Sequence, residues 1–393
     1  MLAPRLDGIP QWAEAASAPT GLPALLAANL RFALRLQSQL LRQSGSRNVF
    51  FSPFSASLAL AMLYNGASGH TRRAMSEAFT SGALTTADIN SGNLQLLNEL
   101  HSRDAAITLN VSDAIWLRQG FAVVPAFAAA LQGYYSAVPR SANFADPRTP
   151  GAINAWVSRQ THGLISSIVG PLDPATVLLL INALYFKGAW SAPFSPEATR
   201  PASFTTGGGQ KKTVPMMAQT GSFAYAHGVG TEVIRLPYGN GRLSMIVVLP
   251  PNGGLRSWVA GLTPATWTAV LASLAPAHGS LRLPRFSVNY GTSLKPALSA
   301  LGMGEAFQSR SAQFPGILAG QHAFVGDIRH RAVLKVNEHG TLAAAVTTIS
   351  VGVTAIPGRS FNIVVNRPFF CAIRDDITAS LLFCGAIKDP ASF

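Results

Sequence analysis

Apolar residues recur at three- and four-residue spacings in the first part of the chain, which is the pattern of helices with one buried face. The first such stripe begins at Leu25 and brings Leu30, Phe32 and Leu40 to one side. Shorter stripes follow along the chain. They predict further helices over residues 55–65, 88–103, 151–169, 262–274 and 294–301.

Strand patterns dominate from residue 177 onward. Residues 177–186 form a nearly continuous apolar run, typical of a strand buried on both faces, and residues 107–117 alternate like a half-buried strand. Further strands are predicted over residues 231–237, 243–249, 281–288, 331–336, 361–365, 368–373 and 381–387. Without an internal repeat, this order predicts a single α+β domain over residues 25–393, preceded by a proline-rich tail over residues 1–24.

One long segment near the C-terminus is poor in charge. Between Glu338 and Asn366 the only cationic side chains are His339 and Arg359, and no turn signal occurs before Pro357. Its Thr, Val and Ile residues favour extended structure, so the segment could add to a sheet. Loops of this length in compact domains are usually functional, and a surface loop without function is the alternative.

Composition excludes several classes of protein. With 48% apolar residues, 12% charged residues and only 2 cysteines, the chain is neither disordered nor a disulfide scaffold. The net charge of +13 is scattered rather than interleaved with aromatic residues, so we expect no nucleic-acid surface. No apolar run is long enough for a membrane span, and the N-terminus shows no signal peptide. Localisation therefore stays open.

Motifs for catalysis are weak or missing. The eight histidines have no zinc-ligand spacing, and no GxSxG segment is present. The glycine-rich residues 207–213 lack the spacing of a phosphate loop and are better interpreted as a hairpin tip. His330 precedes a predicted strand, where a structural histidine is the default interpretation and a catalytic one the alternative. We expect no metal, no cofactor and no enzymatic activity.

A series of short sequence blocks follows in a fixed order along residues 25–393. The blocks are NVFFSPFS at 48–55, NAWV at 154–157, THG at 161–163, NALYFKGAW at 182–190, VPMM at 214–217, LPY at 236–238, MIVVLP at 245–250, LPRF at 283–286, LGM at 301–303, HRAVL at 330–334, NEHGT at 337–341 and NRPFF at 366–370. Each block alone is weak evidence, but in this order they resemble the serpin family of protease inhibitors, and the shared order is specific.

This resemblance implies a fold and a mechanism. The fold has three β-sheets, with a large central mixed sheet, about nine helices and an exposed reactive loop at about residues 338–362. The mechanism is suicide inhibition: a target serine protease cleaves the loop, and the loop inserts as a strand into the central sheet and traps the acyl-enzyme. Stored strain in the metastable fold drives the trap. A prokaryotic source is a further expectation.

The resemblance also assigns a hinge to the start of the loop. Alternate side chains there must enter the space beneath the sheet, so they must be small and uncharged. Gly340 supplies a pivot, and Leu342 stands at an outward position where the family often has Glu. These features favour the inhibitory type; a non-inhibitory carrier or chaperone is the alternative. The hinge residues are Glu338, Gly340, Thr341, Ala343, Ala344, Ala345 and Thr347.

The usual hinge-to-bond distance in the family places the reactive bond at Thr354-Ala355. The alternative is Arg359-Ser360, which looks like a trypsin-type site. The longer segment to Arg359 would leave slack after insertion, so we expect substrate-like cleavage there. Small and β-branched residues before Ala355 suit the shallow pockets of elastase-like or subtilisin-like proteases.

Five further residues match functional positions of the family. Ser52, Ser55, Asn182 and His330 match the shutter, a polar cluster beneath the strands that part, and Trp190 matches the breach, where insertion begins. Residues 88–103, which match the glycosaminoglycan-binding helix, contain one Arg and two acids, so heparin activation is not expected. We expect a monomer, able to form loop-sheet polymers, and an extracellular location. Cys371 and Cys384 lie in the two arms of a predicted hairpin, bonded or free.

Overall fold

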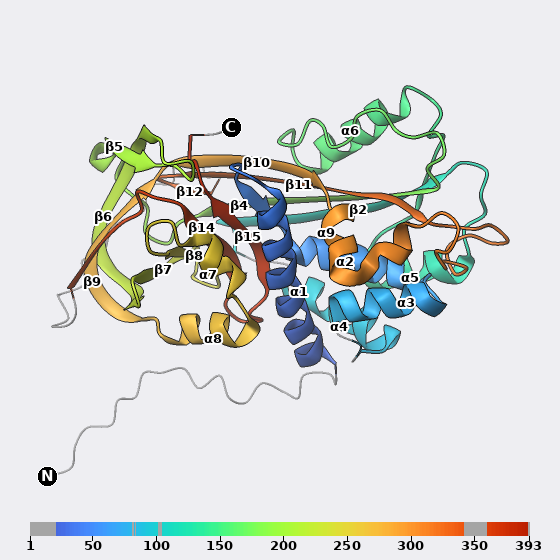
Figure 1. Ribbon diagram of the computed structural model, residues 1–393, viewed down its shortest axis with the longest axis horizontal. Helices are drawn as coiled ribbons and strands as arrows, with labels where there is room; N and C mark the ends of the chain where they lie inside the picture. Colours follow the sequence, from blue (N-terminus) through green and yellow to red (C-terminus); the bar gives the residue numbers. More distant parts are fainter. Residues whose placement is uncertain (1–20, 81, 83, 101–103, 342–359, 392–393) are drawn as a thin grey trace, which may run out of the picture.

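The structure is a computed structural model that describes residues 21–80, 82, 84–100, 104–341 and 360–391. Its long strands cross the molecule as one layer, with α6 on one face and most of the other helices on the opposite face (Figure 1). Within the described residues the chain forms nine α-helices and fifteen strands. The expected α+β class with about nine helices is therefore confirmed.

The central sheet has six strands in the order β10-β11-β12-β4-β2-β3. Strand β11 runs parallel to β4, and β2 runs parallel to β3, whereas the pairs β10–β11, β11–β12, β12–β4 and β2–β4 are antiparallel. The strands are β2 (Ile107–Arg118), β3 (Arg140–Ala142), β4 (Leu178–Ala189), β10 (Phe286–Ser293), β11 (Val325–Asn337) and β12 (Gly340–Thr341).

The remaining strands form one hydrogen-bonded sheet in the order β1-β15-β14-β8-β7-β6-β9-β13, with β5 on β6. The 18-residue β6 joins two strand groups, because its early residues pair with β5 and its last five with β7. The three expected sheets are thus the central sheet and two groups that share β6. The strands are β1 (Val49–Phe51), β5 (Arg200–Thr205), β6 (Lys211–Gly228), β7 (Thr231–Tyr238), β8 (Leu243–Leu249), β9 (Ala275–Pro284), β13 (Ser360–Val364), β14 (Phe369–Asp375) and β15 (Leu381–Ile387).

The helices begin at sequence features that satisfy or remove free N–H groups. Ser52 caps α2 by accepting a hydrogen bond from the Ser55 N–H. Pro53 occupies the first turn, where a backbone N–H would have no partner within the helix. The helices are α1 (Leu22–Gln43), α2 (Pro53–Tyr64), α3 (Gly69–Met75), α4 (Thr86–Leu100), α5 (Pro125–Tyr135), α6 (Thr149–Gln160), α7 (Leu255–Ala260), α8 (Pro264–Ala272) and α9 (Lys295–Leu298).

Three of the differences from the predicted elements have clear physical causes. Helix α1 begins at Leu22, inside the predicted tail, because Pro23 fits its first turn. Helix α6 ends at Gln160 rather than at residue 169, since His162 and Gly163 both take positive φ angles. The single strand predicted over residues 281–288 is two strands, because the chain passes from one sheet to the other after Pro284.

Two hydrophobic cores cover the two faces of the central sheet. The larger one lies between this sheet, the second sheet and the helices that include α1 and α2. The smaller one lies between the sheet and α6, where Trp116 and Trp156 meet edge to face with their ring centroids 6.2 Å apart. The all-buried α2, at the centre of the larger core, places its N-terminus directly beneath the central strands.

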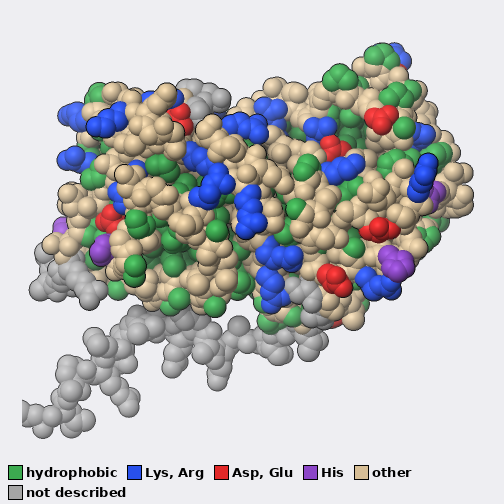
Figure 2. Space-filling model, viewed as in Figure 1, with side chains coloured by type: hydrophobic (Ala, Val, Ile, Leu, Met, Phe, Trp, Pro, Cys, Tyr) green, Lys and Arg blue, Asp and Glu red, His purple; other side chains and the backbone are tan. Residues whose placement is uncertain are grey.

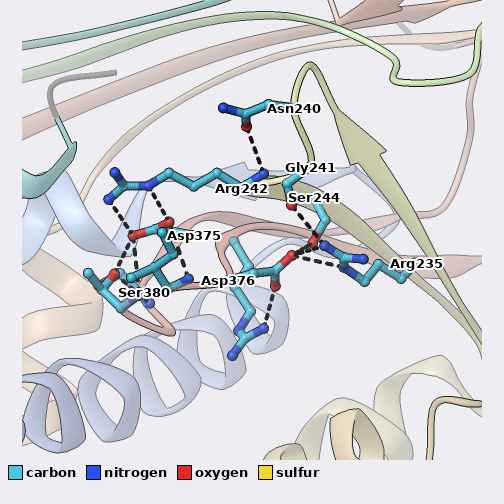
Figure 3. A network of polar contacts seen from close by, with 11 residues as sticks. Arg235, Asn240, Gly241, Arg242, Ser244, Asp375, Asp376 and Ser380 are labelled. Carbon is cyan, nitrogen blue, oxygen red and sulfur yellow. Dashed lines mark hydrogen bonds and ion pairs between the residues drawn. The ribbon is translucent and has the colours of Figure 1, made fainter. Parts of the chain in front are cut away.

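A network of ion pairs fixes the turn between β14 and β15 (Figure 3). Asp376 accepts hydrogen bonds from Arg235 Nε at 2.8 Å and from Ser244 Oγ at 2.7 Å, and Asp375 accepts one from Arg242 Nε at 2.9 Å. Because these partners lie in or between β7 and β8, the network ties three neighbouring strands together at one end of the sheet.

The two cysteines are free and buried. In the β14–β15 ladder Cys371 lies opposite Gly385, and Cys384 lies opposite Ala372. A one-residue offset points the two thiols to opposite faces of the sheet, so they cannot form a disulfide in this fold.

Candidate functional site

The central sheet is closed along one half and parted at one end. Strands β11 and β4 pair directly from Val325 opposite Leu178 to Ala332 opposite Leu184. Farther along, β12 stands between them: Thr341 pairs with Val336 on one side and with Gly188 on the other. The chain after β11 therefore turns back and begins a new strand between β11 and β4.

The first two residues of this new strand fit a tight space. Gly340 has a φ of +145°, and a Cβ atom there would lie 2.1 Å from the Gly188 carbonyl oxygen. Glycine is therefore required at this position. Thr341 is fully buried, and its Oγ1 lies 2.7 Å from the hydroxyl of Tyr238 beneath the sheet.

Trp190 closes the parted end of the sheet. Its indole Nε1 donates a 3.0 Å hydrogen bond to the Asn337 carbonyl, and its backbone N–H donates one of 3.0 Å to the His339 carbonyl. The indole stacks on the Tyr238 ring with the centroids 4.4 Å apart. Trp190 thus holds both ends of the turn between β11 and β12.

Glu338 anchors the same turn from the other side. Its Oε1 accepts hydrogen bonds from Arg285 at 2.5 Å and from Thr199 at 2.6 Å, and its carbonyl accepts one from Phe194. Burial acts to raise the pKa of Glu338, but the hydrogen bonds from Arg285 and Thr199 outweigh it, and the net pKa is lowered. The ionised carboxylate is therefore the form that holds the turn.

The predicted shutter residues lie together under the closed half of the sheet. Asn182 is opposite His330 in the parallel ladder, and its Oδ1 is hydrogen-bonded to the His330 Nδ1. The His330 Nε2 accepts a 3.3 Å hydrogen bond from the Ser52 N–H, and Asn182 Nδ2 donates one of 2.6 Å to Ser55 Oγ. Burial lowers the pKa of His330 to about 3, so the imidazole is neutral.

Asp113, which sequence reasoning missed, completes this cluster. It lies opposite Asn182 on β2, and its Oδ1 accepts hydrogen bonds from Ser55 Oγ at 2.7 Å and from Asn182 Nδ2 at 2.8 Å. A signal was available: Asp113 interrupts an apolar alternation that includes Leu109, Val111 and Ile115. Asp113, Asn182 and His330 thus form a polar row across β2, β4 and β11.

The other predicted residues lie mostly beyond this site. Ser360 is exposed at the start of β13, where it pairs with His278 of β9. The hinge and reactive-bond residues that lie outside the described residues are Ala343, Ala344, Ala345, Thr347, Thr354, Ala355 and Arg359.

Among the described residues, no group of three or more potential metal-ligating side chains occurs, and no helix is long and apolar enough to cross a membrane. Helix α4 itself carries no Lys or Arg. The residues at 207–210 lie at a turn between the antiparallel β5 and β6, as the hairpin interpretation predicts.

The chain belongs to the serpin (serine protease inhibitor) family, whose sequence model matches residues 27–390. It is 34% identical to Iripin-8 of Ixodes ricinus over 93% of both chains. It is 35% identical to the leukocyte elastase inhibitor of Sus scrofa, over 93% of this chain and 99% of that protein. Both relatives are eukaryotic, so they give no support to the expected prokaryotic source.

Solved structures agree with the fold. The native-state crystal structure of the thermophilic serpin Tengpin superposes with a TM-score of 0.85 at 26% identity, covering 93% of this chain and 94% of that one. Human thyroxine-binding globulin with its hormone gives a TM-score of 0.88 at 26% identity, covering 95% and 100%. The fold is therefore that of a serpin.

We predict that His330→Ala weakens the closed sheet. The change leaves the buried Ser52 N–H and Asn182 Oδ1 without their partner, which costs about 1–3 kcal/mol. The melting temperature should fall, and oligomers should form on warming, as measured by scanning fluorimetry and size-exclusion chromatography. The exposed His322→Ala is the matched control. Unchanged melting and no oligomers in His330→Ala would contradict the prediction.

Proposed function

We propose that this serpin inhibits a serine protease as a suicide substrate, by inserting its cleaved loop between β11 and β4. The observation that carries the proposal is β12, because its two residues already pair with both strands at the point where insertion starts. The relative from Sus scrofa is named as an inhibitor of leukocyte elastase. Inserted strands gain backbone hydrogen bonds on both sides, which supplies the driving force.

The register of β12 supports this route. Thr341 points into the core beneath the sheet, so Ala343, Ala345 and Thr347 would point the same way in an extended strand. All three are small and uncharged. Insertion therefore places no bulky or charged side chain against the buried cluster around Tyr238.

The same register favours Thr354-Ala355 as the reactive bond. Because Thr341 pairs with Gly188, an inserted strand would bring Val351 opposite Leu178, the first residue of β4. Thr354 would then lie just beyond the end of that strand. Arg359 would lie eight residues beyond Val351, which leaves roughly 26 Å of slack between the sheet and the protease. Slack would let the protease recover and release the chain.

The residues before the proposed bond indicate the class of target. Residues 349–354 are Ile, Ser, Val, Gly, Val and Thr, which offer only small or β-branched side chains to a protease pocket. We propose an elastase-like or subtilisin-like enzyme as the partner, in a covalent complex with a monomeric inhibitor. Heparin is not proposed as an activator, since α4 lacks basic residues.

We predict that incubation with pancreatic elastase or subtilisin gives a covalent complex that survives SDS. Mass analysis of the complex should place the ester at Thr354 or a direct neighbour, because a bond there leaves much less slack than one at Arg359. The matched variant Arg359→Ala should form the complex equally well. An adduct at Arg359 would overturn the assigned bond, and cleavage without any complex would favour a carrier or chaperone instead.

We predict that Ala345→Glu converts the inhibitor into a substrate. In an inserted strand the new carboxylate would point the same way as the buried Thr341, into the core and without a cationic partner, which costs several kcal/mol. Elastase should then cleave the loop while the yield of covalent complex falls at least tenfold. Leu342→Glu is the control, since its outward side chain should not hinder insertion. Equal trapping by both variants would contradict the proposed path.

A further inference from the structure

Asp113 has an unusual environment for a carboxyl group. Its Oδ1 accepts two hydrogen bonds, whereas its Oδ2 is sealed from solvent and has no hydrogen-bond partner. The Oδ1 partners are Ser55 of α2 and Asn182 of β4, and Asn182 in turn holds His330 of β11. Asp113 on β2 is thus linked to α2 and to β4 and β11, the two strands between which the loop would insert.

We propose that Asp113 is a proton-operated lock of the central sheet, which holds the sheet closed as a neutral carboxyl and loosens it when ionised. Oδ1 accepts the hydrogen bonds from Ser55 and Asn182 whether the carboxyl is neutral or ionised. The proton of the neutral carboxyl therefore lies on Oδ2. Ionisation would leave a buried charge on an oxygen without a donor. Opening of the sheet would hydrate that charge, so ionisation favours opening.

The surroundings of Asp113 give no compensating charge among the described residues. It lies on the wall of a cleft of about 440 Å³ between β2, α2, α4 and the end of α5, whose only other titratable side chains are Tyr134 and Tyr135. His330, which follows Asn182 in the polar row, is neutral. No described cation therefore replaces the proton.

The direction of the pH effect follows from the carboxyl. Burial raises the pKa of Asp113 to about 8, although the hydrogen bonds from Ser55 and Asn182 act to lower it. In the unfolded chain an Asp titrates near 4. The folded form therefore holds one more proton between about pH 4 and pH 8, and its stability falls as the pH rises through this window. This lock is present in the unreacted chain and does not depend on which loop bond is cleaved.

The test compares the wild type with Asp113→Asn, which is isosteric and always neutral, between pH 5 and pH 9. For the wild type, the melting temperature should fall relative to the variant, and heat-induced oligomerisation should accelerate, as the pH rises toward 8. The infrared difference between wild type and variant at pH 6.5 should show a protonated-carboxyl band that titrates out near pH 8. Glu99→Gln, which removes an exposed carboxylate of α4, should show the same pH dependence of melting temperature and oligomerisation as the wild type.

A second variant guards against a folding defect in Asp113→Asn. Ser55→Ala removes a hydrogen bond that favours the ionised carboxylate of Asp113. In this variant the protonated-carboxyl band should therefore titrate out at a higher pH than in the wild type. Parallel pH profiles for wild type and Asp113→Asn, or a missing carboxyl band at pH 6.5, would overturn the proposal. Either outcome leaves protease trapping untouched, since that is measured separately with elastase.

Discussion

The direct pairing of β11 with β4 is the contact on which the rest of the structure depends. These two parallel strands form the middle of the central sheet, yet they are joined directly only from Val325 to Ala332 on β11. At the other end β12 already occupies the position between them. A new strand between two existing ones makes hydrogen bonds to both. The chain can therefore exchange the closed pairing for an arrangement with more backbone hydrogen bonds.

Two groups of side chains stabilise the closed arrangement. At the parted end Trp190 and Glu338 hold the turn before β12 by hydrogen bonds to the backbone and to Arg285. At the closed half the polar row of Asp113, Asn182 and His330 links three strands to the N-terminus of α2. Buried polar networks of this kind stabilise one arrangement strongly and fail together when one bond is broken.

Much of this arrangement could be predicted from the sequence, and the failures have physical causes. Alternation and apolar runs placed β8 and β15 at their observed bounds, and the ordered family blocks brought Ser52, Ser55, Asn182 and His330 to one expected cluster. Local patterns could not show that β6 is shared by two strand groups or that Thr341 is inserted, because both depend on pairing between distant segments. Asp113 was overlooked because a carboxyl is expected at the surface, and the enclosure of its Oδ2 depends on partners from α2 and β4.

The most direct test of the central claim measures thermal resistance before and after the loop is cut. A non-target protease that cleaves between residues 349 and 359 frees the loop to become a complete strand between β11 and β4. The cleaved, purified chain should then unfold at a much higher temperature than the intact chain in scanning calorimetry. A melting temperature equal to or below that of the intact chain would show that the loop does not insert.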